Sequence, residues 1–131
     1  MDIFLGAEIE GPAAGKWFAL QKAFSESLSV LGERNYGESL TSIGIISIIM
    51  PTEFFEDGGY KERRFYSAQR KAADIRLQIG YTDFVKADNE TRKRIYRSHI
   101  LEAVRIAATK AGSGLDGSRL LRDVEQLLEQ T

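Results

Sequence analysis

Acidic side chains on two alternating stretches of the sequence could support metal-assisted chemistry. Glu8 and Glu10 occur two residues apart in DIFLGAEIE, and Asp74 lies in the stretch AADIRLQIGY. Residues two apart share one face of a strand, so clustered carboxylates could hold Mg²⁺ for phosphodiester hydrolysis. However, Arg76 is available as an ion-pair partner, and no lysine accompanies the acids at the spacing of a nuclease motif. We therefore expect solvated strand faces, with no metal and no other cofactor.

Three further patterns that resemble functional motifs have structural explanations. His99 is the only histidine, and it falls on the apolar stripe of a helix, with no serine or cysteine nucleophile in a recognisable pattern. The stretch GSGLDG at 112–117 matches the glycines of dinucleotide-binding loops, but it joins two helices instead of a strand and a helix. The basic run RKRIYR at 92–97 is spread around a helix. We predict a protein that is not an enzyme and does not bind nucleic acid.

The loop PTEFFEDGGY at 51–60 combines apolar and acidic side chains. It has two interpretations: a hairpin connection whose phenylalanines fold back onto the core, or part of an interface with another protein. Aromatic side chains within a charged rim are typical of the residues that dominate binding energy in interfaces. Under the second interpretation the partner-binding residues are Glu53, Phe54, Phe55, Glu56 and Asp57, joined by Glu8 and Glu10.

Hydrophobic periodicity predicts the elements that must position these residues. Alternation of apolar and polar residues indicates strands at 2–9 and 73–81, and the isoleucine-rich stretch SLTSIGIISIIMP is typical of a strand that stops at Pro51. Apolar residues at three- and four-residue spacing indicate helices at 13–33, 89–110 and 120–128, the last with Asp116 or Ser118 available as N-cap. We favour extended structure for 61–72, with a short helix as the alternative. Gly58 and Gly59 would allow a hairpin back from the preceding strand.

The order of these elements is β-α-β-β(-β)-α-α, which predicts an α+β fold. Strands followed by helices suggest an antiparallel sheet of three or four strands packed with three helices. We expect a single domain, 1–131, because this length suits one ordinary core. In the isoleucine-rich strand, Ile46, Ile48 and Met50 lie on the face opposite the other isoleucines. Such a strand is either covered on both faces or meets a partner on its open face.

Composition and charge favour a soluble intracellular protein. The absence of cysteine excludes disulfides, a thiol nucleophile and cysteine-ligated metals. The net charge is −1, yet residues 1–60 hold nine acidic and three basic side chains, whereas residues 61–131 hold ten and fifteen. The molecule is therefore expected to be electrically polarised. Because there is no signal peptide and no run of about 18 apolar residues, we expect a cytoplasmic location and no membrane association.

The run FYSAQRKAADIRLQIGYTDF at 65–84 resembles a segment of bacterial immunity proteins from polymorphic toxin and contact-dependent growth inhibition systems, particularly immunity protein 44. The similar features are Tyr66-Ser67, the basic Arg70-Lys71, the alternation from Asp74 to Ile79, and Tyr81 with Phe84 ahead of paired helices. The likeness extends more loosely from the first strand to the last helix. It implies a small cytoplasmic α+β protein that binds and neutralises one cognate toxin domain.

Chemistry of the residues is compatible with that role and leaves two alternatives open. Many such toxins are nucleases with basic clefts, and an acidic surface with aromatic residues at its centre can occupy such a cleft. One alternative is a small metal-dependent nuclease or other enzyme that uses the carboxylates of the sheet face. The other is a homodimeric scaffold that buries Ile46, Ile48 and Met50 in a self-complementary patch. Because no credible catalytic constellation is present, we favour the toxin-binding interpretation.

Overall fold

The computed structural model describes all residues except 57–60, and of Phe55 and Glu56 it describes the backbone alone. The strands are β1 (Asp2–Ile9), β2 (Ser42–Ile49), β3 (Arg63–Ser67) and β4 (Ala72–Gln78). The α-helices are α1 (Ala13–Leu28), α2 (Thr52–Glu56), α3 (Tyr81–Lys86), α4 (Asn89–Ala111) and α5 (Gly117–Glu129), with short 3₁₀ turns η1 (Ser29–Glu33) and η2 (Gly112–Gly114). The three long helices lie where periodicity predicts them, and the extended structure expected within 61–72 is the separate strand β3 with the turn after it.

The sheet has the strand order β1-β2-β4-β3 and is mixed. β1, β2 and β4 run parallel to one another, and only the edge strand β3 is antiparallel to its neighbour. The prediction of an antiparallel sheet is therefore wrong. The reason is that α1 and η1 form a crossover that returns the chain to the starting edge, so β2 runs in the same direction as β1. The fold is α+β, as expected.

The predicted hairpin between the isoleucine-rich strand and the next one is also wrong. β2 is flanked by β1 and β4, so β3 has no place beside it and pairs with β4 instead. The hairpin that exists joins β3 to β4 through residues 68–71, where Lys71 adopts a positive φ of 55°. Gly58 and Gly59, which were expected to make the turn, lie outside the described residues.

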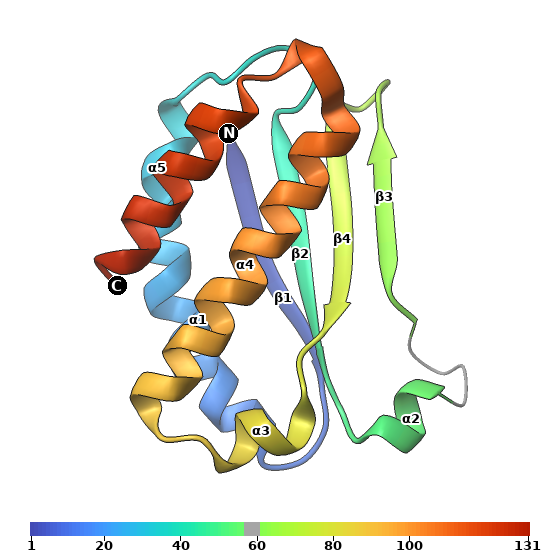
Figure 1. Ribbon diagram of the computed structural model, residues 1–131, viewed down its shortest axis with the longest axis vertical. Coiled ribbons are helices and arrows are strands. Elements are labelled where there is room, and N and C mark those ends of the chain that lie inside the picture. Colours follow the sequence, from blue (N-terminus) through green and yellow to red (C-terminus); the bar gives the residue numbers. More distant parts are fainter. Residues whose placement is uncertain (57–60) are drawn as a thin grey trace.

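The long helices cover one face of the sheet and leave the other face without a helical layer (Figure 1). α1 packs on β1, α4 packs on β2, β3 and β4, and α5 packs against both of these helices. The core between the layers is built from the apolar stripes of the helices and one face of every parallel strand. Its members on the α-helices are Ala13, Trp17, Leu20, Phe24, Leu28, Phe84, Tyr96, Ile100, Ala103, Val104, Ala107, Leu120, Val124 and Leu128.

Helix ends follow the local chemistry that the sequence indicates. The Asp88 side chain accepts a hydrogen bond from the Thr91 amide at 2.7 Å and caps α4, and Asp116 accepts from the Arg119 amide at 3.2 Å and caps α5. Of the two N-cap candidates for the last helix, Asp116 is therefore the one used. In the part of the chain that the structure describes, no helix has the length and apolar character needed to cross a membrane.

Candidate partner-binding site

The face of the sheet that points away from α1 and α4, here called the helix-free face, has a composition set by strand register. Along each strand, every second side chain points into the core, as Ser47 shows by contacting His99 of α4. The side chains between them point to the opposite side and form the helix-free face. They are Asp2, Phe4, Gly6 and Glu8 of β1, Ser42, Gly44, Ile46 and Ile48 of β2, Ala72, Asp74, Arg76 and Gln78 of β4, and Arg63, Phe65 and Ser67 of β3.

Two exposed aromatic rings stand on the helix-free face. Phe4 is 63% exposed and Phe65 is 43% exposed, and both belong to the same cross-strand row, Phe4-Gly44-Asp74-Phe65. Neighbouring residues in such a row lie side by side across the sheet. The two rings therefore flank a glycine and an aspartate on the inner strands.

Two carboxylates of the helix-free face, those of Glu8 and Asp74, lie close to arginines of the protein itself. Glu8 on β1 forms an ion pair with Arg76 on β4, and Asp74 lies 3.9 Å from the Arg63 guanidinium. Glu8 and Asp74 are separated by β2, and they belong to different rows of the sheet. Among the side chains of residues 1–54 and 61–131, no group of three acidic or histidine side chains is placed to hold a metal ion. This geometry lends no support to the metal-dependent nuclease alternative.

Four of the predicted partner-binding residues lie at the carboxyl end of the parallel strands. Glu8 is at the end of β1, and Glu10 follows directly, exposed, with its amide donating to the Ile49 carbonyl at 3.2 Å. α2 begins just beyond β2, at the lower end of the sheet in Figure 1, and carries Glu53 and Phe54. Glu53 is exposed and Phe54 is 47% exposed, so the Phe54 ring does not fold back into the core.

The remaining predicted binding residues fall where side chains are not described. Phe55 and Glu56 belong to the backbone of α2, and Asp57 lies outside the described residues. The apolar patch proposed for a homodimer is largely internal, because Ile48 and Met50 are buried within the single chain and only Ile46 is partly accessible. The carboxyl end thus presents Glu10, Glu53 and Phe54 to solvent.

The only histidine belongs to a buried polar pair. His99 Nε2 lies 2.9 Å from Ser47 Oγ, which is fully buried, and His99 itself is 8% exposed. Burial lowers the pKa of His99 to about 4, so the imidazole is neutral at neutral pH. Although serine beside histidine resembles a nucleophile and base, a substrate cannot reach the buried hydroxyl. The pair is a satisfied element of the core, as the sequence predicts for this histidine.

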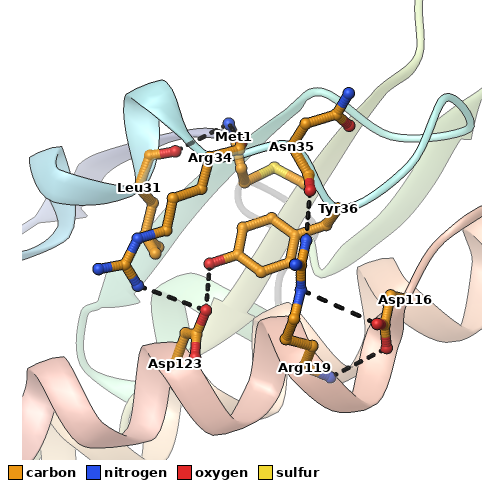
Figure 2. A network of polar contacts seen from close by, with 8 residues as sticks. All are labelled: Met1, Leu31, Arg34, Asn35, Tyr36, Asp116, Arg119 and Asp123. Atoms are coloured by element: carbon orange, nitrogen blue, oxygen red, sulfur yellow. Dashed lines mark hydrogen bonds and ion pairs between the residues drawn. The ribbon is translucent and has the colours of Figure 1, made fainter.

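A second polar network fastens the loop after η1 to α5 (Figure 2). The Tyr36 hydroxyl donates to Asp123 at 2.5 Å, and the Arg34 guanidinium lies 3.3 Å from the same carboxylate. The Arg119 guanidinium stacks over the Tyr36 ring at 4.6 Å and donates to the Asn35 carbonyl. The hydrogen bond from Tyr36 holds the pKa of Asp123 below its usual value, while burial raises the pKa of Tyr36. The network holds a loop in place and offers no reactive group.

Sequence reasoning did not identify Phe4 and Phe65 as candidate binding residues. The signal was present, because Phe4 alternates with Ile3 and Leu5 and so occupies the face that also carries Glu8. A large aromatic residue on the polar side of an alternating strand is an exposed apolar side chain. Recognising the pair also requires the register across four strands, which local patterns do not contain.

The chain was compared with known proteins and with families of proteins. No curated protein and no solved structure matches it. The family model of immunity protein 44 matches residues 1–130. Since this match covers all but the last residue, and the resemblance at 65–84 points to the same family, the chain belongs to the immunity protein 44 family.

Proposed function

We propose that this protein binds a cognate toxin domain and neutralises it by protein contact, without turnover. The observation that carries the proposal is membership of the immunity protein 44 family over residues 1–130. An immunity protein implies a toxin as its partner. A cytoplasmic location, where the toxin would act on the producing cell or its siblings, is part of the same proposal.

The carboxyl end of the sheet supports contact with a basic toxin surface. Glu10 and Glu53 are exposed, and in the described part of the chain neither makes an ion pair of its own. Phe54 provides exposed apolar area at the same end of the sheet. A negatively charged surface speeds encounter with a basic partner and rejects partners of the wrong charge, while a desolvated aromatic ring supplies affinity. A nuclease domain with a basic substrate cleft is the class of toxin that this end fits best.

The test is protection of growing cells. A toxin domain identified in a neighbouring gene is co-expressed with the wild-type protein or with a variant that carries Glu10→Lys, Glu53→Lys, Glu56→Lys and Asp57→Lys. We expect the wild type to protect and the variant to fail, because like charges placed against a basic cleft repel. Circular dichroism of the purified variant checks that it is folded.

A matched control reverses charge elsewhere. Glu26 and Glu33 are exposed acids of α1 and η1, away from the carboxyl end, and Glu26→Lys with Glu33→Lys is expected to protect as well as the wild type. If the wild-type protein gives no protection and does not bind the toxin domain, the proposed function is wrong. If the fourfold variant still protects, the carboxyl end is not part of the interface.

A further inference from the structure

The amino-terminal half of the helix-free face carries a strip of mostly small residues between two exposed aromatic rings, here called the trough. The floor consists of Ser42 and Gly44 on β2 with Ala72 and Asp74 on β4. The walls are the exposed rings of Phe4 on β1 and Phe65 on β3, in the same row as Gly44 and Asp74. The next row, Gly6-Ile46-Arg76-Arg63, places bulkier side chains across the middle of the sheet and closes the trough at that end.

The glycine at position 44 keeps the trough open. A Cβ added there would make ordinary van der Waals contact with the Ala73 carbonyl oxygen at 3.8 Å and with Asp74 Oδ1 at 3.9 Å, so the sheet has room for a side chain at position 44 and carries none. The other glycine of this face behaves differently, because the Ile46 side chain already lies 2.8 Å from where a Cβ of Gly6 would be. Glycine inside a strand weakens it and often marks the close approach of another backbone. Gly44 is therefore at the point where a partner segment can come nearest to the sheet.

From this geometry we infer that the trough receives an amphipathic α-helix of the toxin domain, with a basic residue within its apolar stripe. The inference deepens the proposed function and rests on it. Three inter-strand steps separate β1 from β3, so the walls stand about 14 Å apart. A helix of about 10 Å diameter can touch both rings and still rest on the floor.

Other occupants fit the walls less well. A single extended strand is about 5 Å wide in the plane of a sheet, so it would leave one phenylalanine in water. The flat face of a second copy of this sheet would rest on Phe4 and Phe65 and leave the floor above Gly44 empty, which loses the contacts that a close-packed interface requires. The same contact would bury the Arg63 and Asp74 side chains with an ion-pair distance of 3.9 Å, which is poor compensation for their lost hydration.

The charge on the trough floor specifies the polar part of the helix. Asp74 is half-exposed and its contact with Arg63 is long, while the Arg63 guanidinium stacks on the Phe65 ring at 4.6 Å. The carboxylate therefore keeps acceptor capacity for a lysine or arginine that approaches from above. An arginine of the toxin helix whose guanidinium is bound by both oxygens of the Asp74 carboxylate would orient the helix along the strands.

Binding of the purified toxin domain by calorimetry tests the inference. Phe4→Ser and Phe65→Ser are each expected to weaken binding by about 30-fold or more, as loss of a central aromatic contact does. Gly44→Val adds a β-branched side chain to the floor without touching either wall. We expect Gly44→Val to be at least as stable as the wild type in thermal unfolding, yet to bind the toxin domain at least tenfold more weakly.

Phe18→Ser is the matched control, since Phe18 is 59% exposed but lies on α1, on the opposite side of the sheet. It is expected to bind within about threefold of the wild type. The helical nature of the occupant is tested by placing the photo-cross-linker benzoylphenylalanine at position 4 or position 65. Cross-links from both positions to residues of one toxin helix support the inference.

The outcomes separate this inference from the proposed function. If the wild type binds the toxin domain and the Phe4, Phe65 and Gly44 variants bind equally well, the trough is not the docking site although the proposed function stands. Cross-links to an extended segment of the toxin, or to a second copy of this chain, would also overturn the inference. If the wild type does not bind the toxin domain at all, both fail.

Discussion

Replacement of His99 tests whether the buried pair with Ser47 makes folding stability depend on pH. The imidazole is 8% exposed, and burial lowers its pKa to about 4 from an ordinary value of 6.5. In the unfolded chain the same imidazole has its ordinary pKa, so as the pH falls below 6.5 the unfolded state takes up a proton before the folded state does. Stability from this residue is therefore fully present above pH 6.5 and is lost as the pH falls toward 4.

The size of the effect follows from the two pKa values. Each pH unit between them changes the free energy of unfolding by about 1.4 kcal/mol. Between pH 7 and pH 5, His99 should lower the free energy of unfolding by about 2 kcal/mol, because the half unit above 6.5 contributes little. This window lies above the titration of Asp88 and Asp123, whose pKa values are lowered by hydrogen bonds from Thr91 and Tyr36, respectively.

The assay is urea unfolding of the wild type and of His99→Gln at pH 7 and pH 5. Glutamine can keep a polar contact with Ser47 but does not titrate. The variant should therefore lack the decrease of about 2 kcal/mol in the free energy of unfolding that we expect of the wild type. Changes due to other groups cancel in the comparison. Equal decreases in the two proteins would refute the reasoning, as would an NMR titration that gives His99 a pKa near 6.5 in the folded state.

Four other perturbations have outcomes that follow from local geometry, and thermal or urea unfolding checks each of them. Gly37→Ala should destabilise by about 3 kcal/mol or more, because φ is 140° and the added Cβ would lie 2.2 Å from a backbone oxygen of η2. Gly15→Ala, in open space within α1, should instead stabilise by about 1 kcal/mol, and a loss there would contradict the argument. Tyr36→Phe removes the donor to Asp123 and should cost about 1 kcal/mol at pH 7, and the difference should shrink as the pH falls through the lowered pKa of Asp123. Arg92→Met leaves the carbonyls at the end of α3 without their buried donor and should cost about 2 kcal/mol; an unchanged midpoint would show that water replaces it.

Part of the candidate site could be read from the chain before folding was considered. The acidic and aromatic character of 51–56 is local, and the exposure of Glu53 and Phe54 agrees with the interface interpretation of that stretch. The sequence identifies Arg76 as an available ion-pair partner for the strand acids, but it does not show that Glu8 is the acid engaged, because the two residues are 68 positions apart and meet only across β2. Local composition identifies which groups can make an interface, and strand order decides which of them are already paired.

Elements whose signal is local were determined by the sequence alone. The apolar stripes of α1, α4 and α5 and the alternation in β1 and β4 all depend on neighbours within a few residues. For the N-cap of α5 the sequence offered both Asp116 and Ser118, and the structure uses Asp116. The short helices α2 and α3 lack enough turns to show a period, and they were not predicted.

Tertiary structure alone decided the direction of β2, the pairing of β3 with β4, and the alignment of Phe4 with Phe65 across the sheet. Strands of either direction carry the same alternation, so periodicity cannot distinguish a parallel from an antiparallel neighbour. That choice depends on how the helices pack between distant strands. It is the packing of α1 and α4 on one face that leaves the other face, with its two aromatic rings, free for a partner.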